Sequence, residues 1–415
     1  MPELDIDWVR GQFPALTQEA NGHPAIYFDG PGGTQVPQRV MDAMSDYLAR
    51  SNANTHGAFA TSRRSDEIIA NAHAAVADLL GCAPDEIVFG PNMTTLTFAL
   101  SRALGREFKA GDEIIVTRLD HDANVAPWVA LEECGAVIRF ADINIQDCTL
   151  DMAGLKNLVS ARTRVIAVGY ASNAVGTLND VAGIVRLAHS VGALAFIDAV
   201  HYAPHGPIDV RALDCDFLVC SPYKFFGPHA GALFGKREHL TRLRPYKVRP
   251  ASDRPPDCWE TGTQNHEGLA GVAAAVDYLA ELGWRAAPEV KNRRAALLAA
   301  FDVIRAYERR LAERLIAGLL AVPGLTFYGI RDAQRFNCRV PTAALRIAGH
   351  TPRQLAEFLG ERGIFTWDGN YYALNLTERL GVEATGGMLR IGLIHYSTAE
   401  EVDFLLESLN EIART

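Results

Sequence analysis

The chain carries two short apolar runs that each lead into a polar residue, Ala193-Leu-Ala-Phe-Ile-Asp198 and Asp216-Phe-Leu-Val-Cys-Ser-Pro-Tyr-Lys224. Short apolar runs bounded by turn residues predict strands that are buried on both faces. Helical patterns alternate with these runs and with five more of the same kind, at residues 86–89, 112–117, 137–140, 164–170 and 230–234. We therefore expect an α/β fold in which a mostly parallel sheet of seven strands lies between helices.

The C-terminal part of the chain shows a different pattern. A long, charged amphipathic helix is predicted over residues 289 to about 320, and short strand and helix patterns follow it. The beginning of the chain predicts a short arm that ends in the turn Asp29-Gly-Pro-Gly-Gly33. These patterns divide the chain into an N-terminal arm of residues 1–30, a large domain of residues 31–287, and a smaller α+β domain of residues 288–415 with which the arm is grouped.

The composition argues against several classes of protein. The 415 residues include 40 Lys and Arg against 49 Asp and Glu, a formal charge of −9, so we expect neither a nucleic-acid partner nor a polybasic membrane surface. No apolar run approaches the roughly 18 residues of a membrane-spanning helix. The acidic N-terminus lacks the basic start and apolar core of a signal peptide. The seven cysteines form no CxxC pair, which predicts reduced thiols and a cytoplasmic location.

Lys224 and Asp198 are the first candidates for chemistry, because ligands of open α/β sheets bind beyond the carboxyl ends of the strands. Burial lowers the pKa of a lysine and only a neutral amine attacks an aldehyde, so Lys224 is a candidate Schiff-base lysine. Alternatively, it is a loop lysine that lies along an aromatic surface. An acid placed like Asp198 can hold a pyridine nitrogen protonated and make a cofactor ring an electron sink, or it can cap a turn. The presence of both residues favours the cofactor.

Three further sites follow from the same pattern. Thr94 and Thr95 open a predicted helix, whose hydroxyl and N–H groups can bind a phosphate, although N-capping alone would explain one threonine. His121 follows the strand at 112–117 and can stack on a flat ring or transfer protons, unless it is a solvated loop histidine. Arg390 lies in an apolar strand, where it suits either a substrate carboxylate or a structural salt bridge.

The sequence gives little support to other cofactors. His201 and His205 have a spacing that suits a metal pair, but Pro204 makes a regular helix unfavourable there and no carboxylate or thiol completes the set, so we expect no metal site. The chain contains no GxGxxG after a strand and no GxxxxGK[ST], which leaves a nicotinamide or nucleoside-triphosphate site without support.

In combination, these residues resemble the class V, fold type I pyridoxal-phosphate enzymes, and most of all their cysteine desulfurase-like branch. The resemblance covers nearly the whole chain and includes the stretches 52–57, 121–128, 172–177 and 259–265. It implies pyridoxal 5′-phosphate as the cofactor and, as catalytic residues, Lys224, His121 and Asp198. It further implies contacts to the cofactor from Thr94, Thr95, Asn173, Asp198, His201, Ser221, Tyr223, Lys224 and Thr263, and contacts to the substrate from Arg390, Asn54 and His56.

The chain departs from that branch at three places. His201 stands where desulfurases usually carry Gln, and Tyr223 stands where they often carry His. Desulfurases also use a nucleophilic cysteine on a mobile loop before the strand of Arg390, whereas residues 363–390 contain no cysteine. The resemblance therefore implies an enzyme that acts on an amino acid through a Schiff base and a Cα carbanion and cleaves a C–S bond by β-elimination.

Other outcomes stay open on the same scaffold. A class V aminotransferase or an amino-acid epimerase would use the same Lys224, Asp198 and Arg390, and a noncatalytic pyridoxal-phosphate-binding protein is a third possibility. The loop of Thr263 resembles one that reaches the phosphate of the other subunit. The resemblance therefore also implies a homodimer with shared active sites and a small amino acid as its partner.

Overall fold

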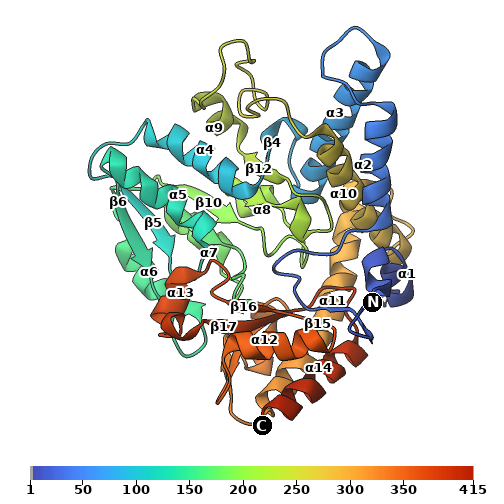
Figure 1. The fold of residues 1–415 in the computed structure, drawn as a ribbon. Helices are drawn as coiled ribbons and strands as arrows, with labels where there is room; N and C mark the ends of the chain where they lie inside the picture. The colour runs from blue at the N-terminus through green and yellow to red at the C-terminus, as the bar shows by residue number, and fades with distance from the viewer. Residues whose placement is uncertain (1–2, 415) are drawn as a thin grey trace.

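A seven-stranded sheet lies at the centre of the larger part of the molecule, which we describe over residues 3–414 in a computed structural model (Figure 1). Neighbouring strands are parallel except at β12, which is antiparallel to both of its neighbours. The predicted mostly parallel sheet is thereby confirmed. The order across the sheet is β4 (Ile87–Gly90), β12 (Gly231–Gly235), β11 (Phe217–Cys220), β10 (Leu194–Asp198), β9 (Thr163–Gly169), β5 (Glu113–Thr117) and β6 (Val137–Ala141).

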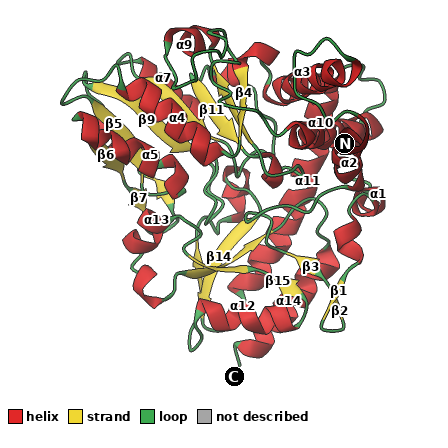
Figure 2. Cartoon of the chain, turned by 45° about the horizontal axis from the view of Figure 1, so that its top comes forward, coloured by secondary structure: helices red, strands yellow, loops and turns green. Residues whose placement is uncertain are grey.

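The strands of this sheet are apolar throughout because alternate side chains enter two separate cores. In β11, Phe217 packs in one core with α4 (Met93–Gly105), and its neighbour Leu218 packs in the core on the other face. Helices therefore cover both faces of the sheet, as the continuous apolar runs require, and Figure 2 shows the sheet between them. The helices of the second core include α3 (Ala60–Leu80), α7 (Val181–His189) and α10 (His266–Ala286).

Two of these helices, α3 and α10, were not identified from the sequence. α10 is rich in alanine and glycine and buries residues on nearly every side, from Leu269 to Leu282. A helix that is apolar all round lacks the polar stripe that reveals an amphipathic helix. Its start is nevertheless marked in the sequence, because the side chain of Asn265 accepts a hydrogen bond from the Gly268 N–H at 2.8 Å.

A smaller, antiparallel sheet forms the C-terminal part of the molecule. α11 (Arg293–Leu320) joins the two parts, because Ala300 packs in the core of the large sheet and Leu315 in the core of the small one. The Asn292 side chain caps α11 by accepting a hydrogen bond from the Ala295 N–H, so the helix begins after the predicted position 289. The strand order is β13 (Leu325–Tyr328), β14 (Thr342–Ile347), β17 (Met388–Gly392) and β16 (Trp367–Gly369).

The N-terminal segment packs against the small sheet. It contains α1 (Ile6–Gly11), and its strand β3 (Ile26–Tyr27) pairs in parallel with β15 (Ile364–Phe365). Asp29 then forms a bridge with Gly392 at the end of β17. These pairings place the turn after Asp29 beside both parts of the molecule.

The remaining elements connect or cover the two sheets. Within residues 3–414, none of the helices is both long and apolar enough to cross a membrane. The other helices are α2 (Gln38–Arg50), α5 (Ala126–Val129), α6 (Met152–Leu158), α8 (Val210–Leu213), α9 (Arg237–Arg242), α12 (Pro352–Glu361), α13 (Leu374–Arg379) and α14 (Ala399–Ile412), and the short strands are β1 (Glu19–Ala20), β2 (His23–Pro24), β7 (Ile143–Asn144) and β8 (Thr149–Leu150).

Candidate active site

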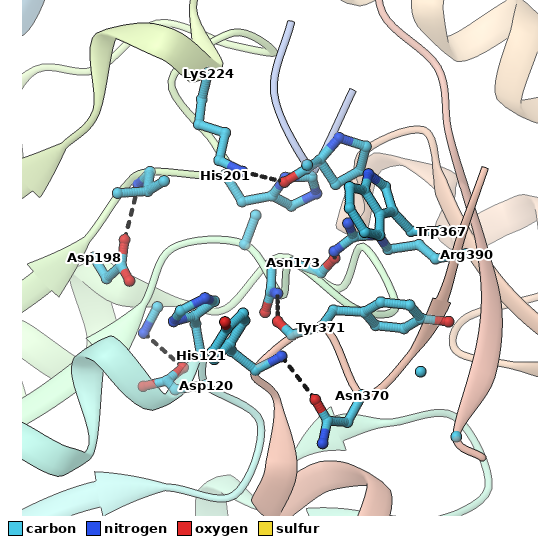
Figure 3. A pocket seen from close by; sticks show the side chains of 18 of the residues that line it. Asp120, His121, Asn173, Asp198, His201, Lys224, Trp367, Asn370, Tyr371 and Arg390 are labelled. Atoms are coloured by element: carbon cyan, nitrogen blue, oxygen red, sulfur yellow. Dashed lines mark hydrogen bonds between the residues drawn. The ribbon is translucent and has the colours of Figure 1, made fainter. Parts of the chain in front are cut away.

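A cavity of about 710 Å³ lies between the carboxyl ends of the strands of the large sheet and the C-terminal part of the molecule that contains the small sheet. Such a volume is within the usual range for ligand pockets. Figure 3 shows Asp198, Asp120 and His121 on one side of the cavity and Trp367, Tyr371 and Arg390 on the opposite side. The strands β9 and β10 are parallel and in register at their ends, which brings residues far apart in the sequence to this one edge.

Lys224 enters the cavity from the turn that follows β11. Its Nζ atom donates a hydrogen bond to the Pro31 carbonyl and lies 4.7 Å from the centre of the Tyr223 ring. Burial lowers the pKa of Lys224 to about 7, and the positive charge of Arg390 contributes to the lowering. A large fraction of Lys224 is therefore neutral near pH 7, as a nucleophilic amine must be.

Asp198 ends β10 and is nearly fully buried. Its carboxylate accepts a hydrogen bond from the Val200 N–H at 2.9 Å. Burial raises the pKa of Asp198 to about 6, while this N–H and Lys224 favour the ionised form. A cationic group placed beside this carboxylate would stabilise its charge.

His121 lies beside the cavity in the neutral form. Burial lowers its pKa to about 4, and Lys224 and Arg390 add to the effect. The Nδ1 atom accepts a hydrogen bond from the Ala123 N–H at 3.0 Å. Its ring stacks on that of Tyr372, with 5.4 Å between centroids and 25° between planes. One face of the imidazole is thus covered by Tyr372.

Arg390 is buried in β17 and presents its guanidinium to the cavity. Its Nη1 atom donates to the Asn173 carbonyl at 2.9 Å, and its guanidinium carbon lies 4.3 Å from the centre of the Tyr371 ring. Burial lowers the pKa of Arg390 to about 10, so the side chain stays protonated near pH 7. Its Nε atom is buried and has no hydrogen-bond partner within residues 3–414, which leaves it available to an anionic ligand.

Asn173 joins the two sides of the cavity. Its Nδ2 atom donates to the Tyr371 carbonyl at 2.9 Å, whereas its buried Oδ1 atom has no partner among the described residues. His201 also lines the cavity, and its Nε2 atom lies 3.0 Å from the Thr342 hydroxyl. Burial holds the pKa of His201 well below its usual value. Both residues offer polar atoms to a ligand in the cavity.

The two threonines at the start of α4 differ in position. Thr94 lines the cavity, whereas Thr95 is exposed and donates through both its N–H and its hydroxyl to the Asn92 side chain, at 2.8 and 2.9 Å. Thr95 therefore completes the cap of the helix in this single chain. Tyr223 lines the cavity and stacks on His229 at 4.9 Å. Ser221 is buried in the preceding turn and does not line the cavity.

Three predicted residues lie away from the cavity. Asn54 and His56 are exposed in the loop after α2, and Thr263 is exposed in the loop before α10. None of the three lines the cavity of its own chain. Figure 1 shows the loop after α2 and the loop after α9 at the same end of the molecule. The predicted contacts of these residues stay predictions.

Several residues of the site were missed because only the fold brings them there. Asp29 is largely buried, which raises its pKa to about 6, and its charge interacts with both Arg390 and Lys224. Burial raises the pKa of Asp120 to about 8, and this carboxyl accepts a hydrogen bond from the Gly169 N–H at 2.9 Å. Glu383 lines the cavity from the segment after α13. Of these, only Asp120 carried a local signal, as a polar residue after a strand.

The polar groups of the cavity fit pyridoxal phosphate. The amine of Lys224 suits its aldehyde, the Asp198 carboxylate its pyridine nitrogen, and the unpartnered Asn173 Oδ1 atom a hydroxyl on the ring. The start of α4 offers the Thr94 hydroxyl and free N–H groups to a phosphate. No group of three or more His, Cys, Asp and Glu side chains able to bind a metal occurs in the described part of the chain.

The comparisons with known proteins point to one family. A cysteine desulfurase from Dickeya dadantii is 33% identical over 99% of this chain and 97% of its own length, and one from Enterobacter sp. is 33% identical over 98% of each. Among solved structures, the chain resembles a cysteine desulfurase from Thermococcus onnurineus NA1 with a TM-score of 0.88 and 26% identity, over 100% of this chain and 99% of that one.

A second solved structure, a cysteine desulfurase from Escherichia coli, superposes with a TM-score of 0.82 and 28% identity over 98% of each chain. These likenesses confirm the predicted fold type I architecture. Residues 26–405 match the aminotransferase class-V family as a whole. The chain is therefore a pyridoxal-phosphate-dependent enzyme and belongs to the aminotransferase class-V family.

Proposed function

We propose that the enzyme cleaves the Cβ–S bond of cysteine or a related amino acid by β-elimination. The names of its relatives support C–S chemistry. One observation supports elimination over sulfur transfer to the enzyme: among the described residues that line the cavity, none is a cysteine. A persulfide mechanism needs a thiolate within reach of the substrate sulfur, and burial raises the pKa of Cys148, Cys215 and Cys220 to about 12.

Arg390 would bind and orient the α-carboxylate of the amino acid. Its guanidinium is charged, buried and partly unpartnered, and a carboxylate can accept two parallel hydrogen bonds from such a group. Tyr371 lies against the guanidinium and fixes its plane. This contact would hold the Cα atom of the substrate in one position relative to Lys224.

Lys224 would remove the Cα proton. Among the cavity-lining residues within 3–414 it is the one lysine, so it also suits the covalent attachment of pyridoxal phosphate. When bound, the cofactor supplies an electron sink for the negative charge that develops at Cα. With a pKa of about 7, Lys224 can accept a proton from Cα and then donate it to the departing sulfur.

Asp198 would supply the negative charge that the site needs, and His121 would add no positive charge to it. The carboxylate of Asp198 stabilises positive charge at the end of β10, where the pyridine nitrogen is expected. His121 is neutral and packed under Tyr372, so it offers a flat surface and not a second positive charge. The backbone carbonyl of Tyr372 also accepts a hydrogen bond from the Asp122 N–H at 2.7 Å, which ties the segment of Tyr372 to the turn that carries His121.

We also infer that the active enzyme is a homodimer. Thr263 is exposed and outside its own cavity, as expected if Thr263 of the partner subunit contacts the phosphate. Light scattering of the purified protein tests this inference. A monomer that binds the cofactor at full strength would contradict it. The cytoplasmic location stays a prediction.

Identification of the carbon product from L-cysteine tests the proposed reaction. Pyruvate, ammonium and sulfide in equal amounts are expected from β-elimination. Alanine as the main product would contradict elimination and would indicate sulfur transfer. Recovery of D-cysteine or of a keto acid that retains sulfur would instead favour epimerisation or transamination.

A further inference from the structure

We propose that the preferred substrates are S-substituted cysteines, thioethers whose sulfur carries an uncharged, apolar or aromatic tail. This inference rests on the proposed β-elimination and names its substrate class. The evidence for this substrate class lies on the side of the cavity that faces the strand ends. That side includes Trp367, Asn370 and Tyr371 (Figure 3). Tyr372 and Glu383 also line the cavity, and Glu383 is hydrogen-bonded to Asn370.

Three aromatic residues, Trp367, Tyr371 and Tyr372, form what we term the aromatic wall of the cavity. The Trp367 indole packs closely against the backbone of Gly32, where an added Cβ atom would collide with it. Tyr372 is 73% exposed yet stacks on His121. Aromatic faces attract thioether sulfur and apolar groups, so the wall suits an S-linked tail better than a bare thiol.

The charges in the cavity disfavour an anionic tail. Within residues 3–414, the cavity has two cationic side chains, Lys224 and Arg390, because His121 and His201 are neutral. Lys224 is required for the chemistry and Arg390 for the α-carboxylate. An acidic tail would therefore have no cationic side chain of this chain left to bind.

Glu383 adds to the selection against substrates with an anionic tail. Its carboxylate accepts a hydrogen bond from Asn370 Nδ2 at 3.0 Å and another from the Thr377 hydroxyl, both of them neutral donors. Asn370 Oδ1 in turn accepts from the Tyr372 N–H at 3.0 Å. Glu383 thus lies beside the aromatic wall with only neutral groups donating to its carboxylate, which would repel a carboxylate at the end of the tail.

The reaction balances without an oxidant or a reductant. Lys224 takes the Cα proton, the Cβ–S bond breaks, and both electrons of that bond leave with the sulfur, which takes up a proton to give the free thiol. Water then converts the remaining three-carbon unit to pyruvate and ammonium. The leaving group is the thiolate of the tail when the substrate is a thioether and hydrosulfide when it is L-cysteine. Neither route needs an enzyme cysteine, so the absence of a cysteine from residues 363–390 is no obstacle.

The test compares S-benzyl-L-cysteine, S-carboxymethyl-L-cysteine and L-cysteine as substrates of the holoenzyme. We expect kcat/KM for the benzyl compound to exceed that for the carboxymethyl compound by at least about tenfold, and also to exceed that for L-cysteine. Equal rates, or a preference for the acidic tail, would overturn the inference. If L-cysteine alone gives pyruvate and sulfide, the substrate class is wrong and the proposed function stands; alanine from L-cysteine contradicts the proposed function itself.

Binding measured without turnover gives a second readout. The carbon analogues 2-amino-5-phenylpentanoic acid and 2-aminoadipic acid replace sulfur by CH₂ and cannot undergo C–S cleavage. Titration of the cofactor absorbance should give tighter binding of the phenyl analogue. Glu383→Gln should reduce the ratio of the two dissociation constants, acidic analogue over phenyl analogue, by about two- to fivefold. Glu378→Gln makes the same change of charge at an exposed position outside the cavity and should leave that ratio unchanged. Equal effects of the two variants would exclude Glu383 as the selecting residue.

Discussion

The two sides of the cavity are built by different kinds of structure. One side, the strand-end wall, carries Asp198 at the end of a buried strand and Lys224 and His121 on turns that follow two others (Figure 3). The opposite side, which we term the loop wall, consists of residues 367–372, the strand β16 and the turn after it, in which Tyr371 and Tyr372 both have left-handed backbones with φ of 55° and 59°. Non-glycine residues rarely adopt this conformation. On the proposed mechanism, the strand-end wall would provide the general chemistry, whereas the loop wall would determine which substrate reacts and how.

The largest effect is expected on the strand-end wall. Lys224→Ala should lower kcat by at least about 10³-fold, because general base catalysis is lost, and should remove the cofactor absorbance near ~420 nm. Stopped-flow assays and absorbance spectra after dialysis measure both. Lys156→Ala, at an exposed position in α6, is the matched control. A Lys224→Ala enzyme with an unchanged, dialysis-stable spectrum would remove Lys224 from its assigned role.

A smaller effect is expected at Arg390, which reaches the cavity from the small sheet. Arg390→Gln should raise KM for the amino acid by about 10- to 100-fold, since a hydrogen bond to a charged group contributes about 1.5–3 kcal/mol, with less effect on kcat. Steady-state kinetics separate the two parameters. A loss of kcat at unchanged KM would instead place Arg390 in the chemical step.

A still smaller effect is expected from the loop wall itself. Tyr371→Leu removes the aromatic face that lies 4.3 Å from the Arg390 guanidinium. A cation–π contact contributes about 0.5–2 kcal/mol, so KM should rise about 2- to 30-fold. Tyr371→Phe keeps the ring and is the control. If the two variants behave alike, the hydroxyl, which donates to the Met388 carbonyl, is the group that matters.

The strand-end wall could be predicted from the sequence because its signals are local. A polar residue after an apolar run identifies Asp198 and Lys224 without knowledge of the fold, and the parallel register then brings them together. Glu383 and Asn370 gave no such signal. They meet across a segment bounded by the antiparallel pair β16 and β17, and the left-handed Tyr371 lies within that segment. Such non-local pairing is not encoded in any one stretch.

The long helices also differ in how well the sequence predicts them. The amphipathic α11 was predicted because one stripe of its surface is polar, although its start was placed too early. α10 buries most of its residues and has few polar positions, and it was missed. Burial is not the whole reason, because α3 has exposed residues along one side and was missed as well.

The smallest expected effect concerns pH, and it tests whether the positive charge of Arg390 in β17 tunes the pKa of Lys224. Only the neutral amine of Lys224 can attack the cofactor aldehyde. With a pKa of about 7, the rate at which cofactor-free enzyme takes up pyridoxal phosphate should rise with pH through about 7 and level off above it. An ordinary lysine would still gain reactivity up to about pH 10.

The positive charge of Arg390 helps to lower the pKa of Lys224. Arg390→Gln should therefore raise that pKa and move the midpoint of the uptake profile to higher pH, whereas Arg390→Lys, which retains a positive charge, should move it less. Stopped-flow absorbance between pH 6 and pH 9 measures the midpoint. An identical midpoint in all three proteins would show that burial alone sets the pKa of Lys224 and that Arg390 acts on the substrate without tuning the base.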